Sequence, residues 1–190
     1  MRGNDVAAVY KFDSEIEQVQ DFSPSRDLAP VIYGLRARGM TVLNDAIVRA
    51  ARDLAQRPEK RRAIVVLSDG ADTHSRASAE KALDAALAAQ ATIYAVDMAA
   101  LDRPSPERQS AASALRNFAN KTGGRYISTP GGQALRDAFA SIVEELGKQY
   151  TLAYRPTNRA RDGRWRTIEV KVARPEVVVR TRRGYRVPRG

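Results

Sequence analysis

Two short polar segments of this chain carry oxygen-bearing side chains of the kind that hold hard divalent cations. In residues 39–47, the hydroxyl of Thr41 stands just before a predicted helix. In residues 64–73, the apolar run of a predicted strand ends in Ser68 and Asp69, and Asp72 follows in the same loop. Hydroxyl and carboxylate oxygens suit Mg²⁺ and Mn²⁺. Ser68 would support such a site from beside Asp69, and Asp72 is either a second support or part of a solvated loop.

Other site chemistries lack their parts. The chain has no cysteine and a single histidine, His74, which excludes thiol catalysis and zinc ribbons. Ser68 does not stand in the Gly-x-Ser-x-Gly turn of hydrolases, and no phosphate-binding loop of the G-x-x-x-x-G-K-[ST] type occurs. A hydrolase based on Asp69 and His74 is therefore the weakest interpretation, and we predict that the chain is not an enzyme.

The elements that must position these residues alternate between strands and helices. Such alternation predicts a doubly wound, mostly parallel sheet with helices on both faces, in which ligands bind beyond the carboxyl ends of the strands. Asp97 also ends a predicted strand there and either closes a turn or faces the ligand. The predicted strands span 5–12, 16–22, 63–68, 92–97 and 125–128, and the predicted helices span 43–56, 78–90, a segment ending near 122, and 133–146, with another beginning at Ser25.

The last forty residues differ from the rest in charge and pattern. Residues 151–190 hold 12 Lys and Arg against three Asp and Glu, whereas residues 1–150 hold 20 against 19. Residues 149–155 and 166–173 alternate as strands do, which predicts an antiparallel β extension of about three strands with Trp165 and Tyr185 in its core. We therefore divide the chain into an α/β domain, 1–147, and a basic extension, 148–190. Nucleic-acid or acidic-surface binding through this extension is the alternative function, although its arginines fall at both parities along the strands.

The Thr41 segment and the Ser68-Asp69-Gly70 strand end together resemble the von Willebrand factor type A (VWA) domain. In that family, a G-x-T-x-L-x-D-A-I-like segment and a strand ending in S/T-D-G supply two loops of a metal-ion-dependent adhesion site. The likeness covers about residues 5–147, and the extension resembles one found in a bacterial group of VWA-related proteins. The resemblance implies a protein-binding module in which Thr41 binds the cation directly and Asp69 binds it directly or through water.

One loop of the family's site has no counterpart here. The family carries D-x-S-x-S after its first, central strand, whereas this chain starts at what would be the second strand. The run Asp21-Phe22-Ser23-Pro24-Ser25 matches by letter, but the residues before it are half polar, so we interpret it as a hairpin exit in which Ser25 caps a helix. We therefore expect an incomplete site that holds a cation only if the missing loop is supplied.

The missing central strand has a second consequence. Strands 5–12 and 63–68 would flank it, and their unpaired edges predict low stability, oligomers, or direct pairing of the two strands with each other. The chain shows no run of roughly 18 apolar residues and no apolar signal core at its start. We therefore expect no membrane span, and the sequence leaves the cellular compartment open. If the chain is a fragment of a longer exported protein, it would work outside the cytoplasm.

The incomplete ligand set predicts weak cation binding. Thr41 and Asp69 alone cannot replace the water shell of Mg²⁺, which dehydrates reluctantly. Titration calorimetry with Mg²⁺ or Mn²⁺ should detect no site tighter than roughly millimolar. A one-to-one micromolar site that Asp69→Ala abolishes would show that this chain already holds a full set of ligands.

Overall fold

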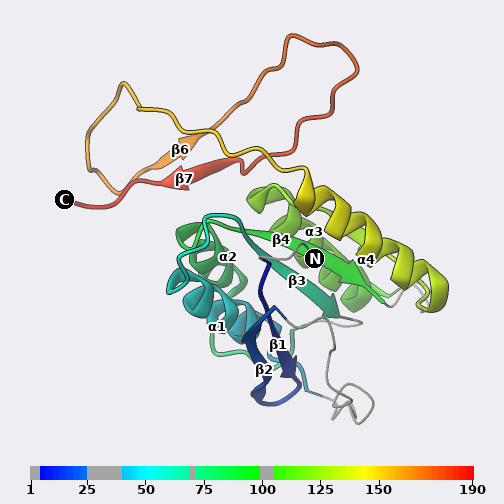
Figure 1. Ribbon diagram of the computed structural model, residues 1–190. Helices are drawn as coiled ribbons and strands as arrows, with labels where there is room; N and C mark the ends of the chain where they lie inside the picture. Colours follow the sequence, from blue (N-terminus) through cyan, green and yellow to red (C-terminus); the bar gives the residue numbers. More distant parts are fainter. Residues whose placement is uncertain (1–4, 25–39, 69–71, 99–104) are drawn as a thin grey trace.

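A parallel sheet lies at the centre of the molecule, as predicted (Figure 1). The computed structural model describes residues 5–24, 40–68, 72–98 and 105–190. Its central sheet has the strand order β3-β4-β5. The strands are β3 (Arg62–Ser68), β4 (Ala91–Asp97) and β5 (Tyr126–Ser128). Ser68 pairs with Asp97 and Asp97 with Ser128, so all three strands end at one edge.

Four helices connect and cover these strands. They are α1 (Leu43–Ala55), α2 (Ala79–Ala88), α3 (Pro106–Thr122) and α4 (Gly132–Gly147). Ser78 and Ser105 cap α2 and α3, because each side chain accepts the backbone N–H of the third helical residue, which the helix itself leaves unpaired. None of the helices in the described part of the chain is long and apolar enough to cross a bilayer.

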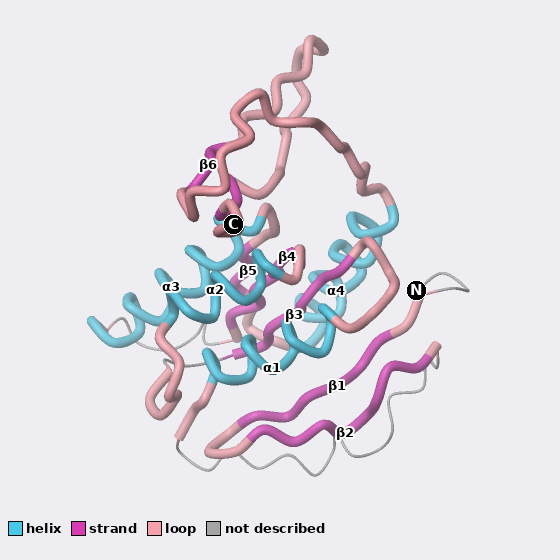
Figure 2. The backbone as a smooth tube through the Cα atoms, turned by 90° about the vertical axis from the view of Figure 1, so that its left-hand side faces the viewer, coloured by secondary structure: helices cyan, strands magenta, loops and turns pink. Residues whose placement is uncertain are grey.

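The sheet is buried on both faces because its strands are apolar on both sides. On one face, Ile64 and Ile93 pack with α1, α2 and α3, whose buried residues include Ile47 and Phe118. On the other face, Tyr94 and Val96 pack against α4. Figure 2 shows the three helices on one side of the sheet and α4 on the other. This arrangement confirms the doubly wound α/β class.

The first two strands form a separate hairpin beside α1. β1 (Ala7–Phe12) and β2 (Ile16–Ser23) pair antiparallel with each other. Phe12 packs against the main core, and the Tyr10 hydroxyl donates to Asp53 Oδ2 of α1 at 2.7 Å. Asp21 lies within β2, as a hairpin residue should. Ser25 and the helix predicted from it lie outside the described residues.

The edge of β3 opposite β4 pairs with no other described strand. β1 pairs with β2 and not with β3, so direct pairing of these two strands, one of three expected outcomes, does not occur. Ala63, Val65 and Leu67 of β3 are only partly buried, in contrast to the fully buried residues of β4. Burial therefore falls toward this edge of the sheet, where the backbone N–H and C=O groups of β3 pair with no other described strand.

The C-terminal segment has far less strand than its alternation predicts. Only β6 (Trp165–Thr167) and β7 (Gly184–Arg186) form, as an antiparallel pair. The predicted strand at 149–155 is wrong, and the one at 166–173 ends after Thr167. Leu152 and Val178 are 74% and 80% exposed, because within the described chain no neighbouring strand or helix covers these apolar positions. Trp165 is 37% exposed, so it does not lie in a core either.

This segment is nevertheless attached to the α/β body at the end of α3. The Arg183 N–H donates to the carbonyl of Lys121 at 3.1 Å, and Arg180 pairs with Glu145 of α4 at 2.7 Å. Gly123 caps α3 at φ +84°, and a Cβ on it would lie 2.5 Å from the backbone nitrogen of Arg182. The attachment is therefore at the amino-terminal end of the sheet, above the arrow tails in Figure 1.

Gly123→Ala should release this attachment. The left-handed backbone costs a side chain about 1–2 kcal/mol, and the new Cβ would also push residues 181–182 away. Trypsin should then cleave at Arg180, Arg182 and Arg183 faster than in the unchanged protein. Gly132→Ala is the matched control, because Gly132 also has a positive φ (+57°) but open space around its Cβ. Equal release of the segment in both variants would contradict a role for the Gly123 contact.

Candidate functional site

The two segments singled out for their oxygen side chains meet in the structure. The Thr41 N–H donates to Thr73 Oγ1 at 2.9 Å. The Thr41 carbonyl accepts from the N–H groups of Thr73 and His74 at 3.0 and 3.1 Å. The loop before α1 and the loop between β3 and α2 therefore run side by side, as expected for loops at one edge of a parallel sheet. Residue Asp69 lies outside the described residues.

The first turn of α1 takes its caps from this second loop. Val42, at the N-cap position, has no side chain that could accept a hydrogen bond. Instead, the Asn44 N–H donates to Asp72 Oδ2 at 2.6 Å and the Asp45 N–H donates to Ser75 Oγ at 3.0 Å. The first N–H groups of a helix have no intrahelical acceptor, and a carboxylate there also meets the positive end of the helix dipole. Asp72 thus acts as a cap supplied from 28 residues away.

Asp45 returns the contact from the helix to the loop. Its two carboxylate oxygens accept from the N–H groups of Arg76 and Ala77, each at 2.9 Å. The Asn44 side chain adds a donation to the Ala77 carbonyl at 3.2 Å. We call this reciprocal set of hydrogen bonds, between residues 41–45 and 72–77, the loop clasp. Asp45 lies in the first turn of α1, where a carboxylate also meets the positive end of the helix dipole. Its partners in the loop are 31 and 32 residues away, so the sequence pattern alone did not predict them.

Asp72 and Ser68 have structural partners of their own. Asp72 accepts from the Ser75 N–H at 3.0 Å and from the Ser75 hydroxyl at 2.6 Å, which closes the turn that follows it. Ser68 is buried, and its carbonyl accepts from the Met98 N–H at 3.0 Å. Neither contact tests the predicted support of a metal site, which stays a prediction.

Asp97, at the same edge, closes an internal ion pair. Its side chain is fully buried, and both of its oxygens accept from Arg108 Nη2 at 2.7 Å. The Tyr126 hydroxyl donates to Asp97 Oδ2, and burial together with this carboxylate raises the pKa of Tyr126. The pair fixes the start of α3 against the end of β4, so Asp97 has the turn-closing role of the two considered.

A cation would find few ligands among the described residues. No group of three or more His, Asp and Glu side chains lies together in the described ranges. The two carboxylates of the clasp, Asp45 and Asp72, both accept backbone N–H groups. A carboxylate that caps amides has fewer lone pairs left for a metal.

Comparison with known proteins bears on the fold only. No protein-family model matches the chain, and no curated protein matches it. A solved structure of the minor pilin PilB from Streptococcus sanguinis is similar, with a TM-score of 0.55 and 15% identity over 76% of this chain and 49% of the pilin. Two further solved structures superpose less well. One is an uncharacterised membrane-spanning protein from Vibrio fischeri, with a TM-score of 0.39 and 20% identity over 76% of this chain and 77% of that protein. The other is BatB, a conserved hypothetical protein from Bacteroides thetaiotaomicron, with a TM-score of 0.48 and 15% identity over 77% of this chain and 81% of BatB.

The loop clasp makes Asp72 a stabilising residue. Asp72→Ala should lower the free energy of unfolding by about 1–2 kcal/mol, because it removes an N-cap acceptor. Asp72→Asn keeps one acceptor oxygen and should lose less. Asp137→Ala is the control, since Asp137 is exposed on α4 and accepts only from the Gln133 side chain. Urea denaturation checks the order, and equal losses in the two alanine variants would contradict the capping role.

Proposed function

We propose that this chain is a protein-binding module of the VWA type that recognises a protein ligand at the carboxyl-end edge of its sheet. The loop clasp carries the proposal. It holds two loops from different parts of the chain in one fixed arrangement. The rim that they form is therefore already ordered before a ligand binds. Binding surfaces that are ordered in advance lose less entropy on association.

Exposed side chains around this rim support the proposal. Met40 precedes the clasp and is 44% exposed, and Met98 follows β4 and is 40% exposed. Thr73, His74 and Arg76 of the clasp loop are exposed as well. Methionine adapts to irregular partner surfaces and, with arginine, is enriched in protein interfaces. The pilin with a similar fold is itself a subunit of a protein assembly by its name.

The proposal needs neither catalysis nor a resident metal. Thr41 and Asp69 would contribute to a cation site of the VWA type only together with a D-x-S-x-S loop from another segment. Such a cation would supply an open coordination position for a carboxylate of the protein ligand. Without it, the rim binds through its side chains and backbone alone.

A second candidate function is nucleic-acid binding by the C-terminal segment, and one observation favours it. Tyr150 and Tyr154 are 92% and 58% exposed, and nearby Arg155 and Arg159 have no acidic partner among the described residues. Exposed aromatic rings beside cations are the usual platform for stacked bases. Binding of this kind should weaken steeply as salt is raised, because it releases counterions from the phosphates.

A site-specific cross-link tests the proposed function. A photoreactive benzoylphenylalanine replaces His74, whose side chain is exposed and whose backbone contact to Thr41 remains. In the native host, this position should cross-link to a discrete protein. The matched control places the same residue at Lys60, which is exposed just before β3 begins, at the other end of the sheet.

The expected result is a cross-linked protein from position 74, none from position 60, and loss of the product when Asp72→Ala loosens the clasp. Equal products from both positions would contradict recognition at the carboxyl-end edge. Cross-linking to nucleic acid from position 60 alone, at the end of the sheet where the C-terminal segment attaches, would favour the second candidate function.

A further inference from the structure

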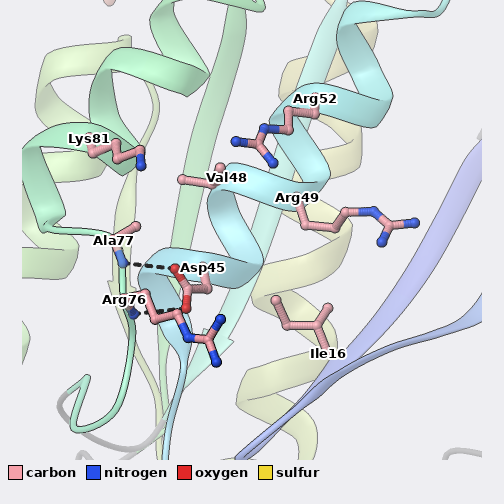
Figure 3. Close-up of a pocket in the computed structure, with 8 residues that line it drawn as sticks. All are labelled: Ile16, Asp45, Val48, Arg49, Arg52, Arg76, Ala77 and Lys81. Atoms are coloured by element: carbon pink, nitrogen blue, oxygen red, sulfur yellow. Dashed lines mark hydrogen bonds between the residues drawn. The ribbon is translucent and has the colours of Figure 1, made fainter.

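A pocket of about 310 Å³ lies between the loop clasp, α1 and the start of β2 (Figure 3). Its floor is aliphatic and comes from Ile16, Val48 and Ala77. Val48 and Ala77 are almost fully buried, and Ile16 is half-buried. The pocket therefore offers an apolar surface at its base that an aliphatic side chain or stem could cover.

The rim of the pocket is cationic. Arg52 of α1, Arg76 of the clasp loop and Lys81 of α2 all line it, and all three are exposed. None of them pairs with a described carboxylate, in contrast to Arg49, which pairs with Asp53 at 2.8 Å. In Figure 3, Arg52 and Lys81 turn their charged ends toward the space above Val48, whereas Arg76 extends on the other side of Asp45, toward Ile16, and Arg49 is turned away. Like charges directed into one space repel each other unless an anion lies between them.

Asp45, the carboxylate among the described residues that line the pocket, does not fill this role. Both oxygens of Asp45 are engaged by the amides of Arg76 and Ala77, at 2.9 Å each, as the dashed lines in Figure 3 show. Asp45 therefore holds the wall of the pocket in place and leaves the side chains of the three cations available. Three positive charges around a small apolar floor are complementary to an acidic group attached to an aliphatic neighbour.

We propose that this pocket binds an acidic, aliphatic peptide segment of the protein partner. One Glu or Asp carboxylate lies between Arg52 and Lys81, a second acidic side chain of the segment meets Arg76, and an aliphatic side chain between them covers Ile16 and Val48. No aromatic ring is found among the described residues that line the pocket, so these residues offer no stacking platform of the kind that single-stranded nucleic acid uses. The proposal rests on the proposed protein-binding function, and it adds the chemistry of the partner and a contact that needs no metal.

Fluorescence anisotropy with a defined probe tests the pocket. The probe is a fluorescein-labelled octapeptide of alternating Glu and Leu, and its control replaces every Glu by Gln. The double variant Arg52→Gln/Arg76→Gln should weaken probe binding by about tenfold or more, because each of the two substitutions removes a charged hydrogen-bond donor. Lys60→Gln/Arg61→Gln removes the same charge at the other end of β3, from exposed residues, and should change binding by about twofold or less. The Gln peptide should bind no better than the double variant binds the probe.

Three results would overturn the pocket. Equal weakening by both double variants would mean that net charge alone attracts the probe. Equal binding of the Gln peptide would exclude carboxylate recognition. Tighter binding of a single-stranded oligonucleotide of equal charge, lost in the Arg52/Arg76 variant, would assign the pocket to phosphates. Thermal unfolding of each variant verifies that it is folded.

The pocket and the proposed function can fail separately. If the cross-link from position 74 persists undiminished in Arg52→Gln/Arg76→Gln, the protein-binding function stands and the pocket is wrong. If the octapeptide binds with the expected variant pattern but position 74 yields no protein, the pocket stands as an acidic-peptide site and the rim is not the interface.

Discussion

The first turn of α1 needs acceptors that its own sequence does not provide, and the arrangement at the carboxyl-end edge depends on this need. Val42 cannot cap the helix, so Asp72 and Ser75 of a distant loop accept the amides of Asn44 and Asp45. Asp45 accepts two amides of that loop in return. Each partner thereby satisfies groups that would otherwise be left without a hydrogen bond. This reciprocity fixes the rim of the candidate site and one wall of the basic pocket.

The two ends of the sheet hold different parts of the chain. At the carboxyl end, the loop clasp and the Asp97–Arg108 pair hold the connections that follow β3 and β4. At the amino end, the C-terminal segment attaches through Gly123 and Arg183. Tyr94 links the opposite face to α4 by donating to Glu145, and burial with this carboxylate raises its pKa to about 12. A partner at the carboxyl edge would thus leave the basic segment accessible.

The strands and helices of the α/β body followed from sequence because their apolar periodicity is local. β3 and β4 are apolar on both faces, and Ser78 and Gly123 mark a helix start and a helix end as their chemistry requires. The prediction of strands in the C-terminal segment was largely wrong, because an alternating sequence forms a strand only where a neighbouring strand pairs with it. Leu152 and Val178 have no such neighbour among the described residues. The basic pocket could not be predicted, since Arg52 and Lys81 meet only through the packing of α1 on α2. The capping role of Asp72 likewise needed the fold.

Amide hydrogen exchange at the loop clasp tests most directly whether the two loops act as one unit. Asp45→Ala removes the acceptors of the Arg76 and Ala77 amides and leaves those of Asn44 and Asp45 in place. If the clasp is cooperative, all four amides should exchange faster, by about 5- to 30-fold for a loss of about 1–2 kcal/mol. Faster exchange at residues 76 and 77 alone, with residues 44 and 45 still protected, would contradict the account.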